Sequence, residues 1–345
     1  MKFTLAVSAL VASANALSTE GQAFLLAERF ESFKAEHGRE YADDAEHAKR
    51  FEIFEANMEQ VAMKNAALRK KGNDEVHGVT KFADRTEDEF SFYLGVDASL
   101  DIPDMPVIKA DNIVNATGGS YNWNDEGKLS PVKDQAQCGS CWAFSATETV
   151  ETAWVLAGND MAILSPQMLV SCDKNGDQGC NGGLPSNAFD QIKTWGGMCT
   201  EADYPYTSGT GNTGTCTSPL PTHTIGTIGE WGYSTTPCQG FKACTEDADA
   251  TIAALKQYGP ISIAVDASGW NTYKGGVLTA DSCSSSPRKM DHAVQLVGYN
   301  ADDANPYWVV RNSWAASWGE DGFIKLAMGG NTCGWQNVPA IIKSV

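Results

Sequence analysis

Cysteine is absent from the first 137 residues of this chain of 345, although ten cysteines follow from position 138 onward. Disulfide bonds therefore cannot hold the N-terminal third together. Basic residues are also scarce, because 25 Lys and Arg stand against 43 Asp and Glu and leave a net charge of -18. Such a surface repels a polyanion, which argues against a nucleic-acid partner. Partial protonation in an acidic compartment would relieve the self-repulsion of these charges.

Long hydrophobic runs are missing too, and no stretch approaches the ~20 apolar residues that a membrane span needs. Residues 1–16 contain only a short apolar stretch, from Phe3 to Ala12, after Lys2 and before the small residues Ala14-Asn15-Ala16. This pattern is typical of a secretory signal peptide cleaved after Ala16. We therefore expect a protein of the secretory pathway, destined for a lysosome or vacuole or for the outside of the cell, where most cysteines form disulfides.

Residues 17–116 are predicted to form a helical module followed by a linker, because two runs carry apolar residues at helical spacing. Residues 95–119 contain two prolines, end in Gly-Gly and hold the glycosylation sequon Asn115-Ala116-Thr117, which indicates a linker. The apolar positions of the two helical runs are Phe24, Leu25, Phe30 and Phe33, and Phe51, Phe54, Met58, Val61 and Leu68.

The rest of the chain, residues 117–345, divides into two halves that differ in predicted secondary structure. Residues 140–157 have the pattern of one strong helix ended by Gly158, within a helical half of about 123–222. In a β-rich half of about 223–345, short apolar and β-branched runs such as GPISIAVDA and DHAVQLVGY predict strands. A cleft between two such halves is a favoured place for an active site.

Histidine is rare, with five in the chain, and this scarcity narrows the search for a catalytic pair. Cys141 stands at the start of the predicted helix, where the helix dipole favours the nucleophilic thiolate. A thiolate needs an imidazole as its proton partner. Three histidines lie in the N-terminal module and His223 lies in a loop, whereas His292 opens a predicted strand. Asn312, between a strand and a Trp-rich turn, is a candidate to orient the imidazole.

The segment QAQCGSCWAFSA around Cys141 resembles the nucleophile block of the papain-like cysteine proteases, and most closely that of the cathepsin L-like branch. Three further blocks resemble the family in the same order: SCDKNGDQGCNGG, DHAVQLVGY and PYWVVRNSWAASWGEDGFIKL. The N-terminal module resembles the inhibitory propeptide of that branch at Glu46, Arg50, Phe54, Asn57, Val61 and Asn65, with valine where isoleucine is usual. A second propeptide motif is matched by Gly78, Thr80, Phe82 and Asp84, with threonine in place of asparagine.

The resemblance implies an α+β, papain-like two-domain fold, helical on one side and β-barrel-like on the other, preceded by a helical pro-segment. It implies that Cys141 is the nucleophile of a cysteine endopeptidase, His292 its general base and acid, and Asn312 the residue that orients His292. Gln135 would form the oxyanion hole together with the backbone N–H of Cys141. Peptide bonds would be hydrolysed through a thioester acyl-enzyme, with no metal or other cofactor.

The resemblance also implies a zymogen. Residues 17–116 would inhibit the mature part, residues 117–345, by lying through its cleft, and cleavage between about Asn112 and Gly119 would remove them. Acidification would trigger release by protonating carboxylates that hold the pro-segment in place. The expected partners are protein and peptide substrates, the chain's own propeptide and cystatin-like inhibitors, and the enzyme is expected to be a monomer.

Positions that the family uses for substrate binding have counterparts in this chain. The Gly182-Gly183 pair would let a substrate backbone approach closely. An all-apolar specificity pocket predicts Leu, Val or Phe as the second residue before the cut, with arginine disfavoured. The implied substrate-binding positions are Gly182, Gly183, Leu184, Pro185, Ala264, Asp291, Ala293, Trp318 and Val338.

The family's pattern also implies the disulfides. By that pattern they join Cys138 to Cys180, Cys172 to Cys216 and Cys283 to Cys333, while Cys141 stays free. Three cysteines remain: Cys238 and Cys244 could close a local loop, or Cys199 could pair with either.

Three other functions compete with the protease. The C-x-x-C spacing of Cys138 and Cys141 is that of a redox motif, but the βαβ context of such motifs is missing. A structural zinc site would need a second closely spaced ligand pair, and no other pair of cysteines has suitable spacing. A catalytically inactive relative, serving as a binding or storage protein, is the remaining alternative, and the retention of all four candidate catalytic residues argues against it.

Overall fold

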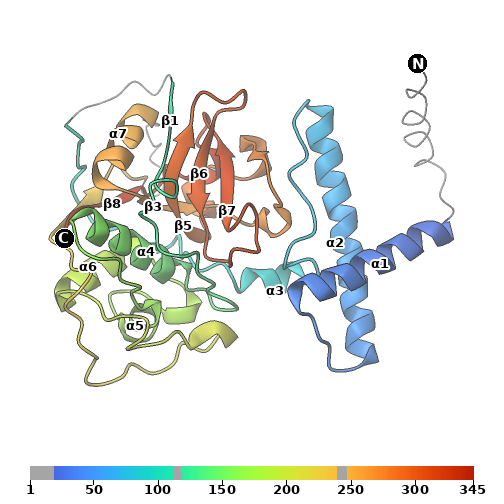
Figure 1. Ribbon diagram of the computed structural model, residues 1–345, viewed down its shortest axis with the longest axis horizontal. Helices are drawn as coiled ribbons and strands as arrows, with labels where there is room; N and C mark the ends of the chain where they lie inside the picture. Colours follow the sequence, from blue (N-terminus) through green and yellow to red (C-terminus); the bar gives the residue numbers. More distant parts are fainter. Residues whose placement is uncertain (1–18, 112–117, 239–246) are drawn as a thin grey trace, which may run out of the picture.

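The computed structural model describes residues 19–111, 118–238 and 247–345. The predicted signal peptide, the sequon at Asn115 and Cys244 lie outside these residues, as does most of the predicted cleavage region. Figure 1 shows the crossed helices α1 (Thr19–His37) and α2 (Asp44–Lys70) standing beside a larger part that contains the sheet. No helix of the described residues is long and apolar enough to cross a membrane.

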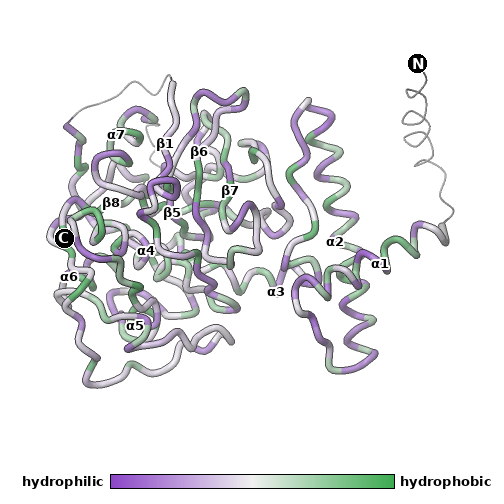
Figure 2. The backbone as a smooth tube through the Cα atoms, in the orientation of Figure 1, coloured by the Kyte–Doolittle hydropathy of each residue, from purple (hydrophilic) through white to green (hydrophobic). Residues whose placement is uncertain are grey.

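Local capping signals set where the helices of the N-terminal module begin. The side chain of Asp43 accepts a hydrogen bond from the backbone N–H of Glu46 and so caps α2. Thr86 and Glu89 form a reciprocal capping box at the start of α3 (Glu87–Ser91). Along its length α2 changes repeatedly between hydrophilic and hydrophobic residues (Figure 2), and its buried residues recur every three or four positions from Phe54 to Leu68.

Aromatic packing takes the place of disulfides in the N-terminal module. Phe30 and Phe33 of α1 pack against Phe54 of α2, with ring centroids 5.2 and 5.4 Å apart. Phe24 and Leu25, which share the helical spacing of Phe30 and Phe33, are 63% and 45% exposed. The start of α1 extends beyond α2 (Figure 1), so no other part of the described chain covers it there.

One mixed sheet organises the larger part of the chain. Its strands lie in the order β2, β8, β3, β5, β6, β7, β4, and β1 also pairs with β5. Neighbouring strands are antiparallel, except that β4 and β7 are parallel. The predicted strands in GPISIAVDA and DHAVQLVGY are confirmed as β3 and β5. The strands are β1 (Ser120–Asn122), β2 (Glu230–Tyr233), β3 (Ile261–Val265), β4 (Val277–Leu278), β5 (His292–Asn300), β6 (Tyr307–Arg311), β7 (Phe323–Ala327) and β8 (Ala340–Ser344).

The predicted helix over 140–157 is confirmed as α4 (Cys141–Leu156), which is buried from Cys141 through Ala153. The chain leaves it at Gly158, whose φ of +94° suits glycine. Two more helices, α5 (Pro166–Cys172) and α6 (Pro185–Trp195), complete the helical half. The sequence did not predict α7 (Ala248–Tyr258), which lies in the β-rich half and is capped by Asp247. Single 3₁₀ turns occur at Gly179–Asn181, Ser208–Thr210, Trp270–Thr272, Ala280–Ser282, Pro287–Lys289 and Thr332–Gly334.

Buried polar contacts fix α4 against the sheet. The hydroxyl of Ser145 donates to the carbonyl of Val294 on β5 at 2.8 Å and lies 2.7 Å from the hydroxyl of Ser262 on β3. Arg311 of β6 forms a buried ion pair with Glu148 of α4 at 3.2 Å. Since a buried charge without its partner is strongly destabilising, this pair ties the two halves together. The start of α4 therefore has a fixed place beside β5.

The three disulfides that the family pattern implied are confirmed. Cys199 is a free, buried thiol whose Sγ lies 3.5 Å from the Sδ of Met168, so its pairing with Cys238 is excluded. The alternative that joins Cys238 to Cys244 lies outside the described residues, because Cys244 does. The confirmed disulfides are Cys138–Cys180, Cys172–Cys216 and Cys283–Cys333.

Candidate active site

Cys141 is the first residue of α4, and its side chain is completely buried. Its Sγ accepts a hydrogen bond of 3.3 Å from the backbone N–H of Ala293, the residue after His292 on β5. The dipole of a sixteen-residue helix acts on this thiol and favours its ionised form. The structure thus brings Cys141 and the start of β5 together where the two halves meet.

Asn312, directly after β6, sets the orientation of His292. The Oδ1 of Asn312 accepts a 2.8 Å hydrogen bond from the backbone N–H of Ser313, and this contact fixes which end of the amide faces His292. The Nε2 of His292 lies 2.8 Å from the same oxygen and therefore carries a proton and donates it. Nδ1 of the neutral ring is left as an acceptor, and it is buried without a hydrogen-bond partner. In this tautomer His292 can take a proton from a neighbouring thiol.

Trp314 covers the ring of His292. The two rings stack with centroids 4.6 Å apart and an interplanar angle of 28°. Trp318 meets Trp314 edge-on at 5.0 Å, and all three side chains are buried. The Trp-rich turn therefore keeps water away from the hydrogen bond between His292 and Asn312, which strengthens that bond in a low dielectric.

Gln135 lies in the loop before α4, and both ends of its buried amide are engaged. Its Oε1 accepts a hydrogen bond of 2.6 Å from the hydroxyl of Ser313. Its Nε2 donates to the carbonyl of Cys138 at 2.8 Å and to the carbonyl of Tyr93, in the N-terminal module, at 2.9 Å. An amide N–H held in this way is the kind of donor that stabilises an oxyanion.

An extended strand of the N-terminal module covers the site. The backbone N–H of Gly183 donates to the carbonyl of Gly95 at 3.0 Å, and the N–H of Val96 donates to the carbonyl of Asp291 at 3.0 Å. No side chain fits at position 95, because a Cβ there would overlap the carbonyl oxygen of Gly139. The chain's own backbone therefore occupies Gly183 and Asp291, two of the positions expected to bind substrate.

Burial under this strand suppresses ionisation of the candidate pair. Burial raises the pKa of Cys141 to about 12, although backbone N–H groups of Ala293, Gly95 and Trp142 oppose the shift. Burial lowers the pKa of His292 to about 4, although its hydrogen bond to Asn312 opposes that shift. Both side chains are neutral at neutral pH in this arrangement, so the reactive thiolate is disfavoured while the strand is in place.

Residues that match the first propeptide motif bind the backbone of the segment that precedes this strand. The side-chain amide of Asn57 donates to the carbonyls of residues 83 and 85, both at 2.9 Å. The amide of Asn65 both donates to the carbonyl of His77 and accepts from its N–H. One face of α2 therefore fixes the backbone that leads into the cleft.

Asp84, the last residue of the second motif, is buried among partners from α2 and from the loop between α1 and α2. It accepts a hydrogen bond of 3.0 Å from the hydroxyl of Tyr41 and pairs with Arg39 at 3.3 Å. Arg50 of α2 donates to the backbone carbonyl of Asp84 and pairs with Glu89 of α3 at 2.7 Å. These contacts join α2, α3 and the loop between α1 and α2 into one unit.

The same motif docks on the β-rich half. The N–H of Gly78 donates to the carbonyl of Thr272 at 2.8 Å, and the hydroxyl of Thr80 donates to the carbonyl of Asn271. Phe82 packs edge-on against Trp314, with ring centroids 5.2 Å apart. The N-terminal module therefore contacts the tryptophan that also covers His292.

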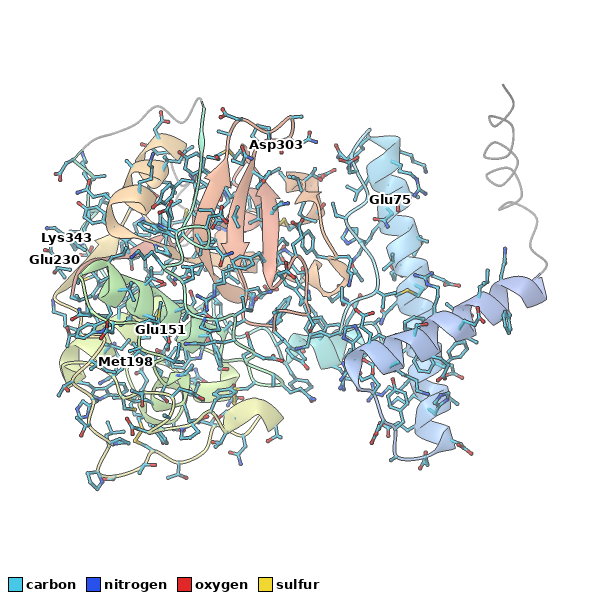
Figure 3. All side chains as sticks on the ribbon, in the orientation of Figure 1. Glu75, Glu151, Met198, Glu230, Asp303 and Lys343 are labelled. Carbon is cyan, nitrogen blue, oxygen red and sulfur yellow. A yellow bond between two sulfur atoms is a disulfide. The ribbon has the colours of Figure 1, made fainter. Side chains whose placement is uncertain are left out.

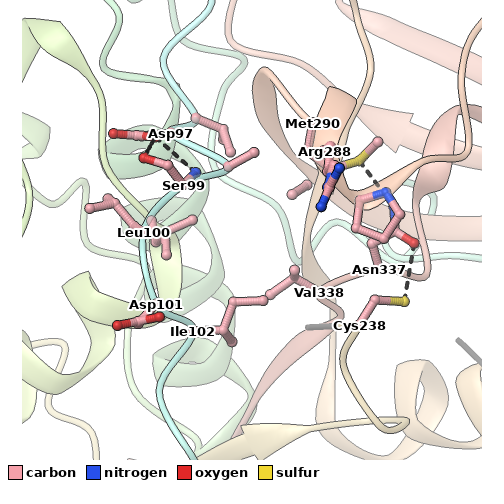
Figure 4. A pocket seen from close by; sticks show the side chains of 15 residues that line it. Asp97, Ser99, Leu100, Asp101, Ile102, Cys238, Arg288, Met290, Asn337 and Val338 are labelled. Atoms are coloured by element: carbon pink, nitrogen blue, oxygen red, sulfur yellow. Dashed lines mark hydrogen bonds between the residues drawn. The ribbon is translucent and has the colours of Figure 1, made fainter. Parts of the chain in front are cut away.

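A cavity of about 350 Å³ lies beside the covered site. Leu184, Ala264 and Val338, three of the expected pocket positions, line it. The sequence predicted an all-apolar pocket. The cavity is only partly apolar, because Arg288 and Asn337 also line it. Figure 4 shows Arg288 and Val338 facing the chain's own segment from Asp97 to Ile102.

Three other expected substrate positions lie elsewhere. Pro185 is the first residue of α6, Ala293 contacts the sulfur of Cys141, and Trp318 packs on Trp314. Leu184 and Gly183, the two residues before Pro185, contact the cavity and the covering strand respectively.

Two buried aspartates, which the sequence did not single out, stand behind the glycine pair. The Oδ1 of Asp177 accepts a 2.9 Å hydrogen bond from the N–H of Leu184, and a Cβ on Gly183 would lie 2.6 Å from the same oxygen. The carboxyl groups of Asp173 and Asp177 interact with each other, and the Oδ2 of each is buried without another partner. Burial raises the pKa of both, and for Asp177 the charge of Asp173 adds to the effect.

Comparison with known proteins identifies the family. The model described as papain family cysteine protease matches residues 117–342. The chain belongs to the papain family of cysteine proteases. The model described as cathepsin propeptide inhibitor domain (I29) matches residues 30–90. The N-terminal module is therefore the inhibitory propeptide of a papain-family zymogen, and we call residues 19–111 the pro-segment from here on.

Relatives in this family extend over nearly the whole chain. A cysteine proteinase of Trypanosoma brucei brucei is 42% identical over 311 residues, which cover 88% of this chain and 64% of the relative. Cysteine proteinase 1 of Leishmania pifanoi is 39% identical over 325 residues, covering 92% of this chain and 85% of that protein. Digestive procathepsin L2 from the larval midgut of Tenebrio molitor superposes with a TM-score of 0.78 at 30% identity, over 93% of this chain and 100% of that one.

Ser313 is the residue of this papain-family site that sequence reasoning missed. Its hydroxyl holds Gln135 and its N–H holds Asn312, so one residue orients two candidate groups. Its place next to Asn312 was the sole signal, and a serine in a polar turn does not stand out by itself.

Proposed function

We propose that the chain is the zymogen of a cysteine endopeptidase in which Cys141 is the nucleophile and His292 the general base and acid. Asn312 orients His292, and Gln135 supplies an oxyanion donor. One observation carries the proposal: a thiol at the start of α4 contacts the residue after an imidazole whose Nδ1 is unpartnered and whose Nε2 is held by Asn312. This combination of thiol, base and orienting group is what acyl transfer to a thiol requires.

In the proposed reaction, Nδ1 of His292 takes the proton of Cys141 and the thiolate attacks a peptide carbonyl. The Nε2–H of Gln135 and the backbone N–H of Cys141 stabilise the charge on the tetrahedral oxygen. The imidazolium then protonates the leaving amine, and a thioester remains. His292 next activates a water molecule, whose attack on the thioester releases the acid and restores the thiol.

The proposed boundaries are a signal peptide over 1–16, a complete propeptide with its linker over 17–116 and a mature enzyme over 117–345. The family match that begins at residue 117 supports the last of these. Three disulfides support an oxidising route through the secretory pathway, to a lysosome or vacuole or out of the cell. Cystatin-like inhibitors are proposed partners of the uncovered cleft, and the enzyme is proposed to act as a monomer.

The proposed specificity is for an apolar residue second before the cut. Leu184, Ala264 and Val338 give the cavity apolar walls, which favour Leu, Val or Phe. Arg288 lines the same cavity, and its positive charge repels a substrate arginine.

Hydrolysis of fluorogenic dipeptides by the acid-treated enzyme tests this function. We expect Phe-Arg to be cleaved at least about tenfold more efficiently than Arg-Arg, because the apolar walls of the pocket do not solvate a second guanidinium and Arg288 repels it. The epoxide inhibitor E-64 should stop the reaction and leave one adduct, on Cys141. A preference for Arg-Arg would contradict the specificity, and the absence of both turnover and adduct would favour an inactive binding or storage protein.

The proposed trigger is acid, and the structure adds a histidine to the carboxylates expected from the sequence. Nδ1 of His77 lies 3.0 Å from the hydroxyl of Thr272, which also accepts a 3.2 Å hydrogen bond from Lys64. Burial and the charge of Lys64 lower the pKa of His77 to about 4. Docking is therefore weakened progressively as the pH falls from about 6.5, the ordinary value, toward 4.

Protonation of Glu89 also weakens the pro-segment as the pH falls, but at a lower pH than protonation of His77. Burial raises the pKa of Glu89, but hydrogen bonds from Arg50 and Thr86 and the charge of Arg50 outweigh burial and hold it below its usual range. The stabilisation from this pair is present above the ordinary carboxyl value, near 4, and is lost as the pH falls below it.

Replacing His77 with glutamine should flatten the acid response. We measure the rate at which E-64 labels Cys141 in the uncut full-length chain at about pH 4.5 and pH 7. The ratio of the two rates should fall about tenfold in His77→Gln, because an amide stays neutral at both values. The control His47→Gln changes a histidine on α2 that is 42% exposed, and its ratio should match the parent chain. An unchanged ratio in His77→Gln would remove His77 from the trigger.

A further inference from the structure

The pro-segment makes a second set of contacts after it leaves the cleft, at the end strand of the sheet. The backbone N–H of Tyr233 on β2 donates to the carbonyl of Pro106 at 3.0 Å, and the N–H of Ile108 donates to the carbonyl of Tyr233 at 2.8 Å. Val107 and Tyr233 pair in parallel. Residues 106–108 therefore extend the sheet as a short added strand.

On its other side β2 pairs with β8, so the added strand occupies the one remaining edge of β2. Figure 3 shows Glu230 of β2 beside Lys343 of β8, and their charged groups lie 2.9 Å apart. An uncovered edge strand presents unpaired N–H and C=O groups to other chains. The pro-segment satisfies these groups at Tyr233.

Side chains of the pro-segment fit the surface around this edge. Ile108 is buried, 6% exposed, in the core of the sheet, whereas Val107 points outward. Ile102 and Met105 pack against the core of the helical half. The hydroxyl of Tyr233 also donates to the carbonyl of Pro103 at 3.0 Å.

Helix α7 completes the contact. The side-chain amide of Gln257 accepts from the N–H of Asp111 and donates to its carboxylate, both at 2.8 Å. The hydroxyl of Tyr258 donates to the carbonyl of Lys109 at 3.0 Å. Backbone pairing along an edge together with a buried alternate side chain is how proteins bind extended peptides by strand addition.

We propose that this surface, formed by Gly232, Tyr233, Gln257 and Tyr258 and called here the β2-edge site, is a second binding site for the pro-segment, separate from the cleft. Its ligand is the extended segment from Pro103 to Asp111. The inference rests on the proposed function in one respect, because that function supplies the cut between about residues 112 and 119. All the contacts lie before that cut, so cleavage leaves them intact.

Two sites on one chain make the pro-segment a bivalent inhibitor. When the strand at Gly95 leaves the cleft, the β2-edge site keeps it at a high effective concentration, and linkage of this kind raises overall affinity by roughly 10²- to 10⁴-fold. A cut pro-segment therefore stays on the enzyme and re-enters the cleft until both sites release it.

Gly232 gives a sharp test of the β2-edge site. A Cβ at this position would overlap the carbonyl oxygen of Pro106 and lie 2.9 Å from the Cδ1 of Ile108. Its φ is not positive, so alanine costs the mature backbone little. The matched control is Gly269→Ala, whose Cβ would meet only the carbonyl oxygen of Ser282, at 3.5 Å.

In the experiment, the full-length chain carrying Cys141→Ala is cut in trans by a trace of wild-type enzyme, which is then blocked with E-64. The cut complex is diluted at pH 7, and loss of the pro-segment is followed by size-exclusion chromatography. We expect the pro-segment to dissociate at least about tenfold faster from Gly232→Ala than from the parent or from Gly269→Ala. A second variant, Ile108→Ser, lies in the pro-segment and cannot disturb the mature fold, and it should speed dissociation in the same way.

The outcomes separate the inference from the proposed function. If wild-type enzyme does not cut the chain, the proposed function fails. If the chain is cut and the pro-segment leaves Gly232→Ala and Ile108→Ser no faster than the control, the β2-edge site is overturned. Immediate loss of the pro-segment from every chain, the parent included, overturns it as well.

Discussion

Replacing Cys141 with alanine is expected to abolish peptide hydrolysis, with a loss on the order of 10⁴-fold or more, because no other group can form the thioester. The matched variant is Cys199→Ala. Cys141 and Cys199 are both free and buried, so each substitution removes one buried sulfur atom. We expect Cys199→Ala to keep turnover within about threefold, since its sulfur contacts Met168 and no imidazole.

Both variants are cut in trans by trace wild-type enzyme, because Cys141→Ala cannot process itself. Hydrolysis of the Phe-Arg substrate is then compared, and thermal unfolding checks that each variant is folded. A loss of similar size in both variants would mean that buried sulfur matters for packing alone. Retained activity in Cys141→Ala would contradict the proposed mechanism.

Replacing Gly95 with alanine is expected to activate the uncut chain at pH 7 by about 10²-fold. The strand that covers the site runs so close to the loop before α4 that an added Cβ would overlap the carbonyl oxygen of Gly139. The backbone must shift, and the hydrogen bond from Gly183 to the carbonyl of Gly95 is lost with it. Overlap of this kind costs about 1–3 kcal/mol, and the lost bond about 1 kcal/mol more, which together shift the covered state by this factor.

The measurement is the rate of E-64 labelling of Cys141 in the full-length chain before any cut. Ser91→Ala serves as the control, because Ser91 is exposed on α3 of the same pro-segment and donates only to a carbonyl within it. Labelling of Gly95→Ala no faster than the control would show that the strand tolerates a side chain there and does not set the inhibition.

The sequence predicted α4 and the strands β3 and β5, and it placed Cys141 at the start of α4 and His292 at the start of β5, because each depends on a strong local pattern or on motifs in a fixed order. It predicted three disulfides for the same reason. Helical spacing alone did not separate the exposed Phe24 and Leu25 from the buried Phe30 and Phe33, because spacing does not say where a neighbouring helix stops. Helix α7 was missed because the runs around it read as strands.

The parts of the site that sequence could not supply depend on contacts between distant residues. Asp173 and Asp177 read as loop residues, and their burial behind Gly183 follows from how that loop folds back. The pairing of residues 106–108 with β2 is likewise invisible in a segment that reads as a Pro-containing linker. The order of the motifs identified the family, but sequence motifs do not predict such contacts between residues that lie far apart in the chain.

The side chain of Trp314 takes part both in binding the inhibitory pro-segment and in shielding His292. Trp314 shields His292 with one part of its ring system and receives Phe82 and Phe90 of the pro-segment on another. A mutation that loosens the grip of the inhibitor at this tryptophan therefore also damages the machinery it would set free. A substitution of Trp314 that releases the pro-segment is therefore also expected to lower the activity of the released enzyme.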